Sequence, residues 1–117
     1  MVAESLRERA RRGTGAGDCE GPDVVRGSAE HPVCGDRVEL SLRVRDGVVQ
    51  ELRWRAAGCP AVFAVAALAA EALVAVPTAR VADVLHEALA GHGGLASHER
   101  HAEAMVGRAL RSALGNG

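Results

Sequence analysis

Hydrophobic and polar residues alternate along two neighbouring stretches in the middle of the chain. The first covers residues 38–45 (VELSLRVR) and the second covers residues 48–56, with Asp46-Gly47 between them. Successive side chains of a β-strand point to opposite faces, so this pattern is typical of strands with one buried face. The sequence therefore predicts a β-hairpin over about residues 37–57.

The length of the hairpin loop decides which residues face each other. With a two-residue Asp46-Gly47 turn, Val44 would pair with Val49, so even-numbered residues of the first strand would pair with odd-numbered residues of the second. The apolar residues are even-numbered on both strands, and they would then lie on different faces of the sheet. A three-residue loop, Arg45-Asp46-Gly47, pairs Val44 with Val48 and keeps the apolar face whole. We therefore predict the three-residue loop.

Three later segments have helical patterns. Residues 60–76 are apolar on nearly every side and stop at Pro77, which predicts a buried helix that begins at a proline. Thr78 can cap a second helix that runs to about Ala90. Over residues 102–114, apolar residues recur with the spacing of an amphipathic helix.

These elements predict a single domain over residues 1–117, of the α+β class. A small antiparallel sheet, made of the hairpin and a short third strand as an option near residues 23–27, is packed on one face by about three to four helices. Residues 1–22 form a loosely ordered N-terminal segment, with a short polar helix over residues 5–12 before a glycine-rich loop.

Composition excludes several classes of partner. The net charge is −1, and Trp54 and Phe63 are the only aromatic residues of these 117, which disfavours binding to nucleic acid or to an anionic membrane. The longest apolar run, residues 59–70, is too short to span a bilayer, and the charged N-terminus does not resemble a signal peptide. We expect a soluble, cytoplasmic protein, in which cysteines bind metal or react rather than form disulfides.

The predicted register brings reactive residues together at the open end of the hairpin. Asp36 would face Ala56, and Cys34 would lie opposite Gly58, next to Cys59. Because Cys59 immediately precedes Pro60, it sits near the start of the buried helix, a position that favours thiolate over thiol.

His101 is the fourth candidate ligand, because it lies in the first turn of the last helix at the edge of the inward face. Two thiolates, a carboxylate and an imidazole can complete a tetrahedral zinc site. Thiolates also suit iron–sulfur chemistry. The sequence thus predicts a metal site that consists of Cys34, Asp36, Cys59 and His101.

Simpler interpretations stand beside this one. A free cysteine is often a small buried hydrophobe, Asp36 could cap a turn, and His101 could be an ordinary core or surface histidine. Cys19 lies in the glycine-rich loop and is expected to be a free thiol. No partner can be argued for the other histidines, which are His31, His86, His92 and His98.

Three separated motifs resemble the U-type iron–sulfur cluster scaffold family, which includes NifU, IscU and SufU. They are HPVCGD at residues 31–36, AAGCPA at residues 56–61 and GGLASHERHAEAM at residues 93–105, with the Asp-Gly hairpin between the first two. The motifs occur in the right order, and the resemblance covers most of the chain from about Leu6 onward.

The resemblance implies a role for each matching residue. Cys34 and Cys59 match the first and second family cysteines, and Asp36 matches the aspartate that tunes cluster lability. His101 matches the histidine before the third cysteine, but Ala102 stands where that cysteine should be. Cys19 is a candidate for a replacement thiolate.

Family members receive sulfur from a cysteine desulfurase, take up iron, build a [2Fe–2S] cluster and pass it to client apoproteins. The resemblance therefore implies a scaffold or carrier rather than an enzyme, which holds iron or a [2Fe–2S] cluster transiently, with Zn²⁺ as an alternative occupant. We expect a monomer or a weak homodimer, since two incomplete sites could share one cluster.

Two further hypotheses remain open. In one, the protein is a zinc-dependent acceptor of persulfide sulfur from the desulfurase, with Cys34 or Cys59 as the accepting residue. In the other, it is a degenerate, metal-free module that binds an assembly partner.

Overall fold

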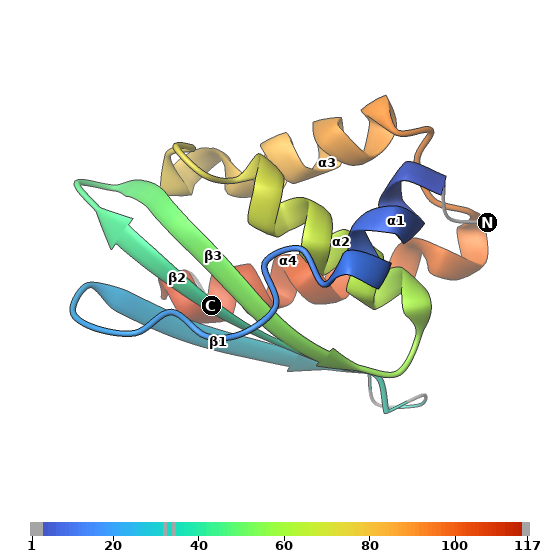
Figure 1. Ribbon diagram of the computed structural model, residues 1–117, viewed down its shortest axis with the longest axis horizontal. Helices are drawn as coiled ribbons and strands as arrows, with labels where there is room; N and C mark the ends of the chain where they lie inside the picture. Colours follow the sequence, from blue (N-terminus) through green and yellow to red (C-terminus); the bar gives the residue numbers. More distant parts are fainter. Residues whose placement is uncertain (1–3, 32, 34, 116–117) are drawn as a thin grey trace.

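The computed structural model of the chain describes residues 4–31, 33 and 35–115, without the side chain of residue 98. Within these residues the chain forms three strands and four α-helices (Figure 1). In chain order the elements are α1 (Glu4–Arg12), β1 (Val24–Glu30), β2 (Arg37–Arg45), β3 (Val48–Ala57), α2 (Pro60–Ala72), the 3₁₀ turn η1 (Thr78–Arg80), α3 (Val81–Gly91), the 3₁₀ turn η2 (Ser97–Glu99) and α4 (Arg100–Leu114).

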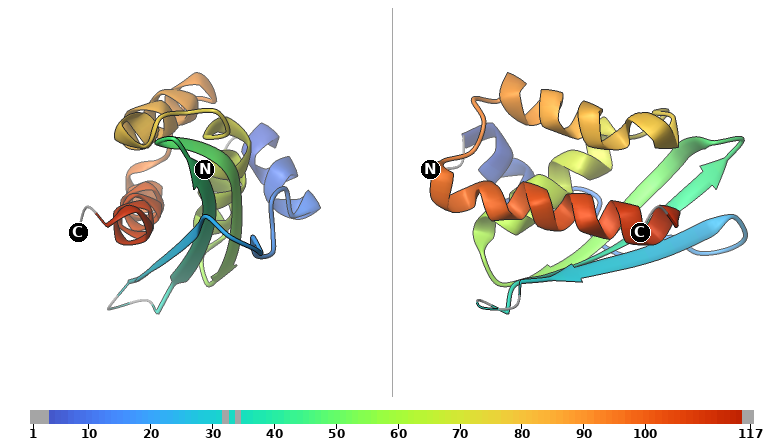
Figure 2. Two further views of the ribbon diagram at one scale, coloured as in Figure 1. Left: turned by 90° about the vertical axis from the view of Figure 1, so that its left-hand side faces the viewer. Right: turned by 180° about the vertical axis from the view of Figure 1, so that it is seen from behind.

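The strands form one antiparallel sheet in the order β1-β2-β3. This confirms the predicted α+β class, the hairpin and the third strand, which runs from Val24 to Glu30 and so extends beyond the predicted range. The apolar face of the sheet is covered by α2, which lies against β3, and by α4, which lies along β1 and β2. Helix α3 packs against α2 and α4, and Figure 2 shows it alongside α4.

The hairpin turn differs from the prediction. Arg45 pairs with Val48, so the turn has two residues, Asp46 and Gly47, and both have positive φ angles, of 54° and 73°. Such angles are typical of two-residue hairpin turns. The predicted three-residue loop is therefore wrong.

A β-bulge explains how the two-residue turn is compatible with one continuous apolar face. Val44 pairs with Val49, but Arg43 pairs with Glu51, so Gln50 is an extra residue on β3. An extra residue shifts the register by one and returns the apolar side chains to one face. Beyond the bulge, each residue of β2 therefore faces a residue two positions further along β3 than we predicted.

The corrected register changes the open end of the hairpin. Arg37 pairs with Ala57, so the next residue outward, Asp36, lies opposite Gly58 rather than Ala56. Asp36 is thereby brought next to Cys59 at the start of α2.

Helix α2 ends at Ala72, four residues before the predicted end. The N–H of Ala75 donates to the carbonyl of Val49 (2.7 Å), and the N–H of Val49 donates to the carbonyl of Val76 (3.0 Å). The backbone after the helix thus pairs with the start of β3, which is incompatible with a further helical turn.

Thr78 does not cap α3 as predicted. The segment begins with η1, whose N-cap is Pro77 and which has no side-chain cap, and α3 itself begins at Val81. The last helix, α4, has the predicted amphipathic character. Its buried residues are Ala102, Met105, Val106, Ala109, Leu110 and Ala113.

Close backbone contact fixes α4 against the sheet. A Cβ atom at Gly27 of β1 would overlap backbone atoms of Ala109 and Ala113. Only glycine leaves room for a helix and a strand at this distance.

The N-terminal segment packs against the helical layer and then crosses to the opposite face of the sheet (Figure 1). Leu6 of α1 is fully buried, and Arg9 forms two hydrogen bonds with Glu71 of α2, at 2.8 and 3.0 Å. The following loop bonds to the backbone of Trp54 through Gly15 and Gly17. No helix in the described part of the chain is long and apolar enough to cross a membrane.

Candidate metal site

Three of the four predicted ligands converge in space. Asp36, Cys59 and His101 each offer a ligand atom, and these atoms all lie within 4.8 Å of one another. Asp36 directly precedes β2, Cys59 precedes α2, and His101 lies in the first turn of α4. The site thus forms where three segments distant in sequence meet.

The fourth predicted ligand, Cys34, lies outside the described residues. Its participation in the site stays a prediction, based on its position two residues before Asp36 and on the motif HPVCGD.

The carboxylate of Asp36 connects the other two residues. It is 5% exposed; its Oδ1 accepts a hydrogen bond from the Cys59 N–H at 3.1 Å, and its Oδ2 lies 3.1 Å from Nε2 of His101. A buried carboxylate needs such partners to offset its desolvation. Asp36 is therefore both a candidate ligand and the residue that holds the site together.

Gly58 allows Asp36 to approach the start of α2. Its φ angle is 107°, and a Cβ at this position would overlap Oδ1 of Asp36. A positive φ and a missing side chain are both required here, and glycine is the residue that supplies both.

Cys59 is the N-cap residue of α2, with an extended backbone (φ −62°, ψ 132°) and Pro60 at the first helical position. Its side chain is half-buried and forms no disulfide. The thiol is thus held in place by a helix start and remains partly accessible, as a ligand or an acceptor group requires.

His31 is a member of this cluster that sequence reasoning missed. Its N–H donates to the carbonyl of Asp36 (2.7 Å), and its ring meets the ring of His101 edge to face, with centroids 5.4 Å apart. His31 therefore touches two candidate ligands, one through its backbone and one through its side chain. Its position in the HPVCGD motif was the available signal.

Cys19 is not brought to the site. It is buried on the opposite face of the sheet, where its N–H donates to Oγ of Ser41 (2.8 Å) and its thiol donates to the carbonyl of Ser41 (3.4 Å). Ser41 is four positions along β2 from Arg37, which corresponds to roughly 13 Å. Cys19 is a free thiol, as predicted, and the structure gives no support to its use as a replacement ligand.

Two histidines for which no partner was predicted do have one. Nδ1 of His86 lies 2.9 Å from a carboxylate oxygen of Glu103, and Nδ1 of His92 lies 2.7 Å from the hydroxyl of Ser5. Ala102, next to His101, is fully buried in the core. This position therefore contributes packing at the start of α4.

The donor set fits a thiophilic metal. Bonds of about 2.0–2.3 Å place the ligand atoms of a tetrahedral zinc site roughly 3.3–3.8 Å apart, and the described atoms are already within 4.8 Å. A mixture of sulfur, nitrogen and oxygen donors is compatible with zinc and with iron. Small side-chain movements would bring the three groups to bonding distance.

Comparisons with known proteins show which family and which fold the chain resembles. The family model for the NifU-like N-terminal domain matches residues 8–116. The iron-sulfur cluster assembly scaffold proteins IscU 1 and IscU 2 of Archaeoglobus fulgidus are each 25% identical to the chain over 115 residues, which is 97% of this chain and 74% of theirs. IscU of Azotobacter vinelandii is 33% identical over 61 residues, 51% of this chain and 48% of that protein.

Solved structures with the same fold include a NifU-like protein (N-terminal) from Brucella abortus, with a TM-score of 0.67 and 19% identity, over 97% of this chain and 94% of that one. A putative SUF-system scaffold from Fervidobacterium islandicum has a TM-score of 0.72 and 15% identity, over 96% and 95% of the two chains. At these identities the structures establish a shared fold.

Proposed function

The chain belongs to the NifU-like N-terminal domain family, and on this premise we propose that it is an iron–sulfur cluster assembly scaffold. In this role it holds iron or a [2Fe–2S] cluster as cargo and passes it to client apoproteins. The protein is a carrier rather than an enzyme, since its site retains and releases cargo without turning over a substrate.

The observation that carries this proposal is the junction of Asp36, Cys59 and His101. A buried carboxylate, a partly accessible thiol and an imidazole gather from three segments, with their ligand atoms within 4.8 Å. Core packing alone would place apolar groups at such a junction, because buried polar groups are costly unless they are paired.

Each residue has a distinct role in the proposed site. Cys59, with Cys34, supplies the thiolates that iron prefers, and His101 supplies a nitrogen donor. Asp36 supplies a harder oxygen donor, which binds iron less tightly than a thiolate would and so favours release. A cysteine desulfurase is the proposed sulfur source, the cytoplasm the proposed location, and a monomer or weak homodimer the proposed state.

A zinc-dependent sulfur acceptor is the second candidate. It is favoured by the proposed donor set, in which the thiols of Cys34 and Cys59 are combined with Asp36 and His101, because Ala102 is buried at the position of the third family cysteine. In the transfer step, the thiolate of Cys59 or Cys34 attacks the terminal sulfur of the desulfurase persulfide. A new S–S bond forms on the acceptor, the donor's S–S bond breaks, and the donor leaves as a thiolate, without net oxidation.

The proposal is tested by metal analysis of protein purified anaerobically without a metal-chelating tag. Zinc, iron and acid-labile sulfide are measured per chain, before and after reconstitution with iron and sulfide. The wild type is compared with Cys59→Ala and His101→Ala. Cys19→Ala is the matched control, because it removes a thiol on the opposite face of the sheet.

Near-stoichiometric metal that is lost in the two site variants and kept in Cys19→Ala would support the site. Iron with sulfide would favour the scaffold, whereas zinc with persulfide formation beside a desulfurase would favour the acceptor. Wild-type protein that takes up no metal even after reconstitution would refute both and leave the metal-free binding module.

A further inference from the structure

The arginine residues of this chain differ sharply in their partners. Of 14 arginines, ten form salt bridges with carboxylates in the described structure, and Arg26 donates to the carbonyl of Cys19. The ten are Arg7, Arg9, Arg11, Arg12, Arg37, Arg43, Arg45, Arg53, Arg55 and Arg80. Within the described residues, Arg100, Arg108 and Arg111 have no carboxylate partner at salt-bridge distance.

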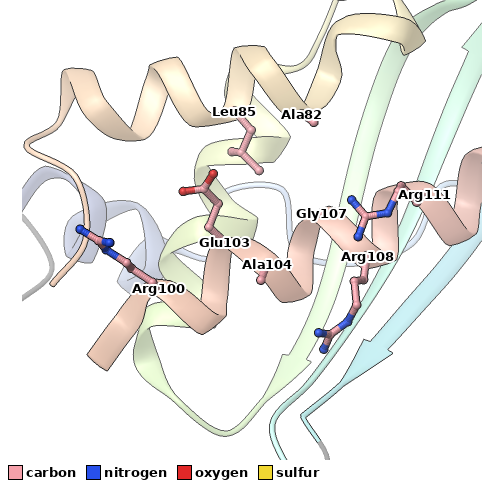
Figure 3. Close-up of a pocket in the computed structure, with 8 residues that line it drawn as sticks. All are labelled: Ala82, Leu85, Arg100, Glu103, Ala104, Gly107, Arg108 and Arg111. Atoms are coloured by element: carbon pink, nitrogen blue, oxygen red, sulfur yellow. The ribbon is translucent and has the colours of Figure 1, made fainter. Parts of the chain in front are cut away.

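These three arginines lie on one helix and line one groove. The groove runs between α3 and α4 with a volume of about 440 Å³ (Figure 3). In Figure 3, Arg100 lies at one end of this surface, and Arg108 and Arg111 lie at the other end. We call this surface the α4 arginine groove. The residues that line it are Ala82, Leu85, Arg100, Glu103, Ala104, Gly107, Arg108 and Arg111.

Small and apolar residues form the middle of the groove. Ala104 and Gly107 of α4 lie on the groove side of the helix with Leu85 of α3 (Figure 3). Glu103, the acidic residue of the lining, lies 2.9 Å from Nδ1 of His86. Its carboxylate is therefore engaged with α3. Arg108 donates one hydrogen bond to the carbonyl of Glu30 at 3.3 Å, but within the described residues no carboxylate neutralises the three guanidinium groups, so their charge remains available to a binding partner.

We propose that the α4 arginine groove binds an acidic segment of a partner protein. Charge complementarity supports this, because arginine binds carboxylates through paired hydrogen bonds. Arg100 and Arg111 are about 16 Å apart along the helix axis. This distance exceeds the size of a single small anion and suits carboxylates spaced along a peptide. The apolar middle of the groove suits apolar side chains between those carboxylates.

Nucleic acid fits the groove less well. No aromatic residue lines it, and base stacking on aromatic rings is a main source of affinity for single strands. The net charge of −1 also provides no general attraction for a polyanion.

The groove is separate from the candidate ligands but begins next to them. Arg100 immediately precedes His101 in the first turn of α4. A bound segment would therefore lie along the helix that carries one candidate ligand. Because the groove contains none of the candidate ligands, it can be tested on metal-free protein, independently of the proposed function.

The test uses a synthetic peptide probe in which glutamates recur on one helical face at the spacing of the three arginines, with alanine and leucine between them. Its affinity for the full chain is measured by fluorescence anisotropy, and amide shifts from NMR locate the binding site. The groove variant is Arg100→Gln, Arg108→Gln, Arg111→Gln. The matched control, Arg7→Gln, Arg45→Gln, Arg55→Gln, removes the same charge elsewhere.

We expect the groove variant to bind the peptide at least about tenfold more weakly, the control to bind like the wild type, and the shifts to fall on α3 and α4. Thermal unfolding shows whether each variant is folded. Equal losses in both variants, or no binding to the wild type, would overturn the proposal. Displacement of the peptide by inorganic phosphate or by a short RNA at comparable concentration would reassign the groove to that ligand and also overturn it.

Discussion

The carboxylate of Asp36 accepts a hydrogen bond from the backbone N–H of Cys59, at 3.1 Å, so one candidate ligand fixes the backbone of another. The same carboxylate faces His101 through its second oxygen. Stability of the apoprotein and affinity for metal therefore depend on the same side chain, and conservative substitutions can separate the two effects.

Asp36→Ala removes the acceptor for the Cys59 N–H, and we expect it to lower the free energy of unfolding of the metal-free protein by about 1–3 kcal/mol. Asp36→Asn keeps an acceptor oxygen but removes the charge, so it should unfold closer to the wild type while binding zinc more weakly. Urea unfolding and zinc titration measure the two effects. If Asn proves as destabilising as Ala, the charge rather than the hydrogen bond stabilises this junction.

Gly58→Ala tests the close approach of Asp36. The added methyl group would overlap the carboxylate, and the φ angle of 107° is unfavourable for alanine. Gly93→Ala is the matched control, because Gly93 has a similar φ of 94° and no neighbour within 4 Å. We expect Gly58→Ala to lose more thermal stability and to bind zinc more weakly than Gly93→Ala. Similar behaviour of the two variants would show that backbone strain alone accounts for the effect.

His31→Ala should weaken zinc binding by about tenfold or more, since residues that orient a ligand commonly have effects of this size. His31→Phe keeps an aromatic edge against the ring of His101 and is expected to restore most of the affinity. Titration against a chromophoric zinc chelator measures both variants. A phenylalanine variant as weak as the alanine variant would indicate that an imidazole nitrogen of His31 is required instead.

The pair of Arg9 and Glu71 predicts a pH dependence. The hydrogen bond from Arg9 holds the pKa of the Glu71 carboxyl below its usual value of 4.5. Because the pKa is lower in the folded state, the pair stabilises the protein above about pH 4.5, and this contribution is lost as the pH falls through the folded-state pKa.

Glu71→Gln should therefore cost about 0.2–1 kcal/mol of unfolding free energy at neutral pH, as partly exposed pairs do, and its deficit should shrink in acid. Glu87→Gln is the control, since its contact with Arg80 is longer, at 3.8 Å, and exposed. Urea unfolding at several pH values provides the comparison. A deficit for Glu71→Gln that does not change with pH would rule out the electrostatic origin.

The pattern of apolar residues predicted most of the elements, because periodicity records which face of a strand or helix is buried. The alternation after Val38 and the stripe that begins at Ala102 both correspond to buried faces in the structure. The hairpin register was not predictable in this way. A two-residue turn with a bulge at Gln50 puts the same apolar residues on one face as a three-residue turn without a bulge. The alternation of apolar residues therefore cannot distinguish the two.

Other differences arise from tertiary contacts. The end of α2 is set by hydrogen bonds of Ala75 and Val76 to Val49, and the apolar sequence after Ala72 gave no indication of them. At the site, Asp36, Cys59 and His101 could be proposed from their positions on predicted elements. The contact of His31 with His101 joins a loop to a distant helix. The HPVCGD motif pointed to His31 itself, but nothing in the sequence indicated this contact.

The close contact at Gly27 controls the position of the opposite end of α4. The helix is pinned to β1 near its C-terminal end, at Ala109 and Ala113, while His101 lies about 18 Å from Ala113 along the axis. A tilt of about 5° around that pivot would move the imidazole by roughly 1.6 Å, which is several times the tolerance of about 0.2 Å for a metal–ligand distance. A single methyl group at position 27 could therefore disable the metal site from the far end of the helix.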